Sequence, residues 1–266
     1  MGSTKAFFYV IKLEVHRILR SSRFLVMLLA SILPMFLYLD LFARQQSVAI
    51  ALYGEAWFKI RSLQVFAFFT PFLAEMIAIL LVADLLGSEK RSSLLVLFST
   101  SSSRLITLLG KFVAALLLTA IGIFSSLLAF DLLLIMWGAP LPALSSQLLA
   151  FTIVLFASLL AASITLCTTS FLIAQEKGSA VGALVPIFIF FVLSFIIETS
   201  IRFGFIDSTM LQYTFLQQFI EIQRYFFFLN AEQTSLYTFY SAIGVISLTI
   251  VVSVLLTTFV IQKLEF

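Results

Sequence analysis

The apolar residues of this chain come in blocks of about twenty or more, and these blocks constrain the fold more than any other feature. A helix needs about twenty apolar residues to cross a hydrocarbon core about 30 Å thick. Hydrophobic residues make up 62% of the 266 positions and charged residues only 11%, whereas a soluble domain carries about 25% charged residues. Because the chain lacks the polar side chains to cover a soluble domain, the sequence predicts an all-α integral membrane protein.

Six apolar blocks predict six transmembrane helices within a single domain, residues 1–266. The first block follows a long basic segment and precedes no small-residue cleavage site, so it does not have the form of a signal peptide. The tight break at 138–142 and the polar break at 175–178 separate later blocks. The predicted crossings are 24–43, 63–86, 106–137, 147–173, 180–201 and 237–261.

Three segments outside the crossings are amphipathic or interfacial in pattern. Residues 4–23 place basic side chains opposite apolar residues at helical spacing, which predicts a helix in the membrane interface. Residues 44–62 hold Tyr53 and Trp57 among charges, as interfacial stretches do. Residues 202–236 predict an amphipathic helix lying on, or dipping into, the outer leaflet, with an apolar face formed by Leu211, Phe215, Phe219, Ile222 and Phe226.

The distribution of Lys and Arg predicts the orientation of the chain. With the N-terminus inside, the cytoplasmic segments hold eleven of the 16 basic residues and the outer segments hold five. Cytoplasmic loops carry the excess of Lys and Arg in membrane proteins. We therefore predict a multi-pass protein of the plasma membrane with both termini in the cytoplasm.

The most informative segment is Asp84–Phe112, DLLGSEKRSSLLVLFSTSSSRLITLLGKF, which joins the second and third predicted crossings. It concentrates charge, serine and glycine between two apolar blocks. The pattern predicts a short helix parallel to the membrane at 87–104, with leucines packed and Glu89, Lys90 and Arg91 facing water.

This segment resembles the cytoplasmic motif of ABC transporter permeases of the type-two family, also called type V exporters. In that family a Gly-Glu-basic cluster leads into a leucine-rich run ending in Ser-Arg, and a Leu-Gly-Lys-Phe follows. The matching residues here are Leu94, 97–99, Ser103, Arg104 and 109–112. Ser92 and Ser93 stand where the family has Gly-Thr, and Ser101 replaces its proline.

The resemblance implies that 87–104 is a coupling helix that docks on a separate ATPase subunit, which would bind ATP and Mg. For Arg104 and Lys111, anchoring to lipid headgroups explains the charge equally well. The implied coupling positions are Asp84, Gly87, Glu89, Lys90, Arg91, Arg104 and Lys111, with a lesser contact from Glu176 and Lys177.

The resemblance also implies a function and an assembly. The chain would be the permease subunit of an ATP-driven exporter and would pair with a second permease subunit, the same or homologous. Its largely uncharged crossings suit a lipid, a hydrophobic peptide or an amphipathic compound. No nucleic-acid partner is expected.

Two alternatives remain open at the level of the sequence. The chain could be a mechanotransmitting or scaffold subunit that moves no substrate and acts on an extracytoplasmic partner docked at 202–236. It could also be a membrane subunit of an unrelated complex, if the match at 84–112 is accidental.

The sequence predicts no enzymatic activity and no cofactor in this chain. Gly110-Lys111 is not a phosphate loop, because position 105 is Leu and Phe112 stands where Ser or Thr must bind magnesium. One His and one Cys cannot build a zinc site without another chain. ATP hydrolysis would therefore come from the partner subunit.

A few polar and small residues inside the crossings are candidates for a pathway or an interface. Glu75 lies in the middle of the second crossing, and a carboxylate there should face protein or water. A protonated Glu75 bonded to a neighbouring helix is the competing interpretation. Asp131 is a second pathway candidate, although it and Glu198 lie close enough to the outer surface for simple solvation. Close helix packing is predicted at the small residues Ala174, Gly178 and Gly182.

Overall fold

The computed structural model describes residues 3–21, 24–26, 28, 29, 32, 46–92, 104–172, 178–207, 210, 214–227 and 236–263. The elements within these residues are helices, as predicted for an all-α chain. Their bounds are α1 Ser3–Leu19, α3 Gln46–Tyr53, α4 Glu55–Ser92, α6 Arg104–Met136, α7 Leu144–Leu172, α8 Gly178–Ile187, the π-helical segment η1 Phe188–Val192, α9 Leu193–Arg202, α10 Phe215–Phe227 and α11 Leu236–Lys263.

Five stretches of the described residues are long and apolar enough to cross a membrane, which indicates a membrane protein. They are Glu55–Ala83, Ile106–Met136, Leu144–Leu172, Ala180–Arg202 and Tyr237–Val260. Each overlaps a predicted crossing, from the second to the sixth. The predicted first crossing, 24–43, lies mostly outside the described residues, so the sixth span remains a prediction.

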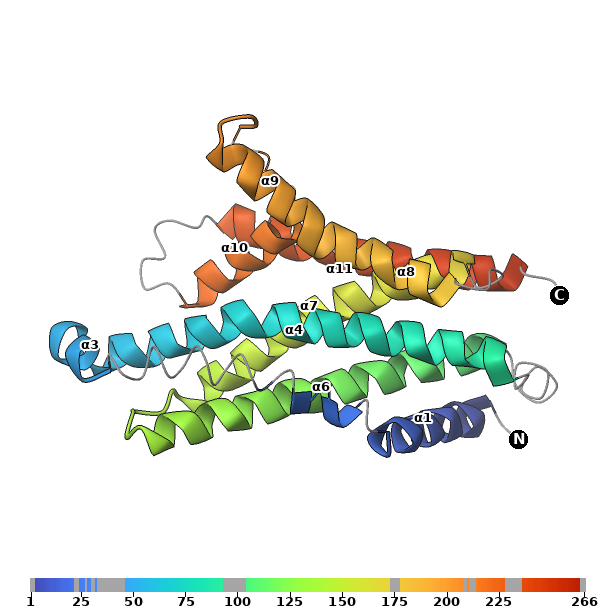
Figure 1. Ribbon diagram of the computed structural model, residues 1–266, viewed down its shortest axis with the longest axis horizontal. Helices are drawn as coiled ribbons and strands as arrows, with labels where there is room; N and C mark the ends of the chain where they lie inside the picture. Colours follow the sequence, from blue (N-terminus) through green and yellow to red (C-terminus); the bar gives the residue numbers. More distant parts are fainter. Residues whose placement is uncertain are drawn as a thin grey trace.

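The bundle has two ends that differ in what gathers there (Figure 1). We call the first the termini end, because α1 begins there and α11 ends there, together with the last turns of α4 and the first turns of α6. We call the second the hairpin end, because α6 turns into α7 there and α3 leads into α4. The predicted 24–43 lies in the sequence between α1 at the first end and α3 at the second.

Helix α7 is the centre of the packing. It contacts α4, α6, α8, α10 and α11, and small buried residues line much of it, including Ala157, Ser158 and Ala161. Small side chains permit close helix approach in a membrane bundle. Phenylalanines fill the larger gaps, with Phe58, Phe66 and Phe130 fully buried in the main core.

Helix α4 is longer than the predicted second crossing at both ends. It has 38 residues, or ~57 Å at 1.5 Å per residue. At its start it includes residues 55–62, which the sequence assigned to an interfacial stretch, and at its end it includes 87–92. The first part of the predicted separate coupling helix is therefore a continuation of α4, and 93–103 lie outside the described residues.

Helix α10 lies within the predicted amphipathic segment at 202–236. Phe219 and Ile222 of its apolar face are buried in the main core, whereas Phe226 remains exposed. The helix packs on α4, α7 and α11. Part of the predicted apolar face therefore packs on the bundle, and the position of the helix relative to the outer leaflet stays a prediction.

The α6–α7 hairpin is fixed by a glycine and by a polar contact. Gly138 has φ +65°, a conformation that glycine adopts without strain, and it ends α6. Across the turn the Gln147 Nε2 donates to Asp131 Oδ1 at 2.9 Å and to the Pro142 carbonyl at 3.3 Å. Asp131 therefore has a partner in α7, which simple solvation at the outer surface did not predict.

Each proline inside a described helix, Pro71 in α4 and Pro186 in α8, is matched by a donor from another helix. A proline lacks an N–H, so the carbonyl four residues before it loses its helical partner. Pro71 leaves the Ala67 carbonyl, to which Gln223 Nε2 of α10 donates at 2.6 Å. Pro186 leaves the Gly182 carbonyl, which lies 2.8 Å from the Thr168 hydroxyl of α7.

Candidate functional site

The N-terminal helix meets the start of α6 through a buried stripe. Val10, Glu14 and Ile18 recur every four residues along α1 and are buried, although the middle one is a carboxylate. Among the apolar residues at helical spacing in 4–23, Ile18 belongs to this stripe, whereas Phe8 and Leu19 are exposed. Helix α1 therefore packs on α6 with a face that includes a charge.

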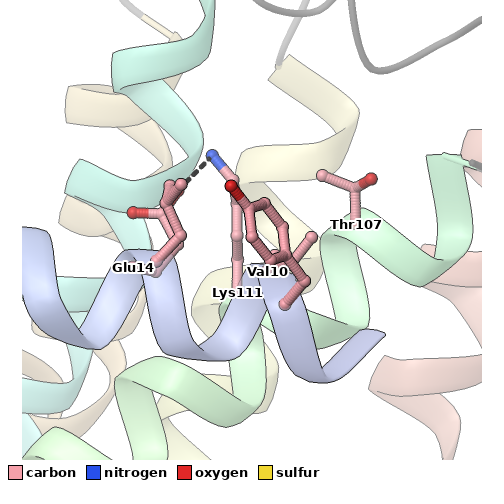
Figure 2. Close-up of a pocket in the computed structure, with 6 residues that line it drawn as sticks. Val10, Glu14, Thr107 and Lys111 are labelled. Atoms are coloured by element: carbon pink, nitrogen blue, oxygen red, sulfur yellow. Dashed lines mark ion pairs between the residues drawn. The ribbon is translucent and has the colours of Figure 1, made fainter. Parts of the chain in front are cut away.

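Figure 2 shows that Glu14 points to Lys111 across this junction. Lys111 Nζ lies 3.2 Å from Glu14 Oε1, and the two side chains are only 7% and 4% exposed. Arg17 Nη2 lies 2.9 Å from the other carboxylate oxygen of Glu14. Because removing one partner of a buried ion pair leaves an uncompensated charge, the loss of Glu14 would destabilise the junction of α1 with α6.

The glycine next to Lys111 permits this close approach. A Cβ atom at Gly110 would lie 2.9 Å from Cγ1 of Val10, closer than side-chain carbons come to each other. Phe112 follows and is buried in a second core cluster with residues of α1, α4 and α7. Three consecutive residues of the Leu-Gly-Lys-Phe run thus serve the junction with α1 and the core beneath it.

The predicted coupling positions are distributed over the termini end. Asp84, Gly87, Glu89, Lys90 and Arg91 lie on the last turns of α4, and Arg104 is the first residue of α6. Lys111 is the position whose ammonium is described, and it is directed to Glu14 within the chain. Glu176 and Lys177 lie outside the described residues.

A separate cavity brings Glu75 together with Glu198. It has a volume of about 180 Å³ and lies between α4, η1, α9 and α10. Its apolar wall includes Phe72, Phe190 and Phe191, and the rings of Phe72 and Phe191 meet edge to face with centroids 4.4 Å apart. Glu75, a residue predicted to line a pathway, therefore lines a cavity in the structure.

The carboxyl group of Glu75 is enclosed by this cavity's wall. Glu75 is only 6% exposed, and among the described residues none forms a hydrogen bond or an ion pair with it. A buried polar group without a partner costs free energy, more so when charged. The competing interpretation requires a neighbouring helix to form a hydrogen bond with Glu75. No residue among those that the structure describes forms one.

Two other polar residues that line the cavity, Glu198 and Gln223, are partnered. Glu198 Oε1 lies 2.6 Å from Arg202 Nη2, and both side chains are substantially exposed. Gln223 lines the cavity while its amide is held by the Ala67 carbonyl. Ser194 lines it from α9 and is buried.

Of the small residues predicted to allow close packing, Gly182 lies in the tightest contact. A Cβ atom there would lie 2.5 Å from Oγ1 and 2.7 Å from Cα of Thr169, so α8 rests directly on α7. Gly178 is the first residue of α8, and Ala174 lies outside the described residues.

Two residues of these sites were missed by sequence reasoning. Glu14 stands among basic residues, but its four-residue spacing from Val10 and Ile18 is a helical signal that could have placed it on a packing face. Gln223 carries no such signal, because its partner Ala67 is 156 positions away.

Comparison of the sequence with models of known protein families and with curated proteins finds no match. The resemblance of the 84–112 segment to ABC transporter permeases therefore remains a prediction.

Proposed function

We propose that the chain is the permease subunit of an ATP-driven transporter, moved by a separate ATPase that docks on 87–104. The observation that carries the proposal is the Asp84–Phe112 segment, which resembles the coupling motif and runs from the end of α4 to the start of α6. On this proposal the ATPase binds ATP and Mg, and this chain supplies the path across the membrane.

The helices on either side of the segment offer a way to transmit movement. Residues 87–92 belong to the same unbroken helix as Glu75, and Gly87 and Glu75 are ~18 Å apart along its axis. A push on the end of α4 would therefore shift one wall of the cavity. After the segment, α6 is attached to α1 by Glu14 and Lys111, so α1 and α6 would move together.

The assembly that this proposal requires is a pair of permease subunits. Large apolar side chains of η1, α9 and α11 are exposed on the bundle, among them Phe188, Phe195 and Leu255. Such a surface suits contact with lipid or with a second copy or homologue. The exporter direction and the lipid, peptide or amphipathic substrate follow from the resemblance and from the sparse charge of the crossings.

Co-purification tests the proposal directly. The tagged chain is extracted from its native membrane, and every protein that accompanies it is identified. We expect a cassette-type ATPase encoded near this chain. If no ATPase accompanies the chain and none is encoded nearby, the permease proposal is wrong and the chain is a subunit of another complex.

A charge-matched pair of variants tests the coupling segment. Glu89→Gln with Arg91→Gln should lower assembly with the ATPase or stimulation of its activity, because the docking charges are lost. Glu55→Gln with Lys59→Gln makes the same change at the opposite end of α4, where the two side chains pair at 2.9 Å. This control should leave assembly with the ATPase and stimulation of its activity unchanged. Equal behaviour of the two pairs would remove 87–104 from the coupling role.

The mechanotransmitting alternative is separated from transport by reconstitution. A purified complex in sealed vesicles that consumes ATP without moving any lipid, peptide or amphiphile, and that retains an outer partner, would favour the alternative. The buried Phe219 and Ile222 of α10 leave less apolar surface for such a partner than the sequence suggested.

A further inference from the structure

The cavity around Glu75 combines three properties that define a ligand class. The first is its aromatic wall, to which phenylalanines from α4, η1, α9 and α10 contribute: Phe72, Phe190, Phe191, Phe195 and Phe219. Aromatic faces attract cations, especially where water is excluded. Such a wall therefore favours an apolar ligand that carries positive charge.

The second property is the sign of the charge in the cavity. Among the described residues that line it, two are carboxylates and none is lysine, arginine or histidine. Arg202 reaches Glu198 at the exposed side, whereas Glu75 has no bonding partner among the described residues. The unmatched acidic group therefore lies in the enclosed part of the cavity.

The third property is the cost of leaving that group alone. An acidic side chain in the middle of a membrane is costly and is found facing protein, water or a functional pathway. A ligand with a cationic centre would give Glu75 a counter-ion, and its apolar substituents would contact the rings. Neutral lipids and anions would gain nothing from the carboxyl group.

We propose that this cavity binds a hydrophobic organic cation, with Glu75 as the counter-ion and the phenylalanine rings around its apolar substituents. A quaternary ammonium or an amine on an aromatic or short alkyl body fits a space of about 180 Å³. The inference rests on the proposed function only in calling this ligand a transported substrate, because binding itself requires no ATPase.

Equilibrium dialysis of the full chain in lipid nanodiscs, without any ATPase, tests the inference. The probe is radiolabelled benzyltrimethylammonium, and empty nanodiscs give the background. We expect saturable binding that unlabelled benzyltrimethylammonium displaces and that phenylmethanesulfonate, an anion of similar shape, does not. Absence of saturable binding, or equal displacement by the anion, would overturn the proposal.

Variants place the binding in this cavity. Glu75→Gln should weaken binding about tenfold or more, because a buried charge pair is lost. Asp131→Asn removes the same charge from a residue that lies outside the cavity and bonds to Gln147, and it should bind as the unmodified chain does. Full affinity of Glu75→Gln would overturn the proposal.

A second variant covers the case in which Glu75→Gln does not give a monodisperse protein. Phe191→Leu keeps an apolar wall but removes one aromatic face, and it should weaken binding about fivefold. Unchanged affinity of Phe191→Leu for benzyltrimethylammonium would contradict the proposed role of the aromatic wall. These measurements use the isolated chain, so binding can be absent while an ATPase still co-purifies. Binding can equally be present when no ATPase co-purifies, so failure of the two proposals can be told apart.

Discussion

At the scale of single residues, Glu14 connects two helices through a buried ion pair. It joins α1 to Lys111 of α6, and both side chains are nearly fully buried. Arg17 contacts the same carboxylate from a side chain that is 42% exposed. The two cations therefore form an internal comparison, because one is shielded from solvent and the other is not.

Glu14→Gln should lower the free energy of unfolding of the purified chain by about 3 kcal/mol, because it leaves the buried Lys111 ammonium without its carboxylate. Arg17→Gln is the control and should cost less than Glu14→Gln, because the Arg17 side chain is 42% exposed and Glu14 keeps its contact with Lys111. Unfolding in a denaturing detergent measures both. Equal losses for the two variants would mean that burial does not strengthen the Lys111 contact.

Gly182 is the residue at which α8 comes closest to α7, and a single methyl group tests that contact. Gly182→Ala should destabilise the chain by about 1–3 kcal/mol, because the new Cβ overlaps the backbone of Thr169, which cannot rotate away. Gly244→Ala in α11 has nothing within 4 Å of its Cβ and should be neutral or stabilising. Thermal unfolding of both variants decides; a harmless Gly182→Ala would contradict the close packing.

At the scale of elements, the two proline-containing helices depend on their neighbours. Gln223 of α10 supplies the donor that Pro71 cannot supply to Ala67, and Thr168 of α7 lies within reach of the carbonyl exposed by Pro186. The Thr168 hydroxyl also lies 3.0 Å from the Ile164 carbonyl of its own helix. The α4–α10 contact is therefore the clearer case for an experiment.

A double-mutant cycle tests the link between α4 and α10. Gln223→Leu should destabilise the chain by about 1–3 kcal/mol, because the Ala67 carbonyl loses its donor inside the bundle. In a Pro71→Ala background the helix provides its own N–H to Ala67, so the same Gln223→Leu change should cost markedly less. Detergent unfolding measures the four proteins. Equal costs in both backgrounds would show that the glutamine does not serve this carbonyl.

At the scale of the whole molecule, the chain begins and ends on one side of the bundle (Figure 1). The predicted orientation adds that both termini are cytoplasmic, so in a Cys167→Ala background single cysteines at Thr4 and Lys263 should react with a membrane-impermeant maleimide only after permeabilisation. A cysteine at Ser145, at the hairpin end, should react in intact cells. Labelling of Thr4→Cys and Lys263→Cys on opposite sides would contradict the arrangement.

The sequence predicted the long apolar helices but not the contacts between them. Five described helical stretches each overlap one of the second to sixth predicted crossings, because lipid requires about twenty apolar residues of any helix. It could not assign the apolar face of α10, since an amphipathic helix has the same pattern on a leaflet and on a bundle. Nor could it match Gln223 with Ala67 or Asp131 with Gln147, because those pairs depend on which helices become neighbours.

The Gln223–Ala67 hydrogen bond also sets an order of events during synthesis. The acceptor leaves the ribosome 156 residues before its donor, a delay of roughly 10–30 s at 5–20 residues per second. Throughout that interval α4 carries an open carbonyl beside Pro71, whereas the donor for Gly182 is already made when Pro186 emerges. Nascent chains that stop before α10 would thus expose a polar defect, and the membrane quality-control machinery would have a physical mark by which to distinguish them from the finished protein.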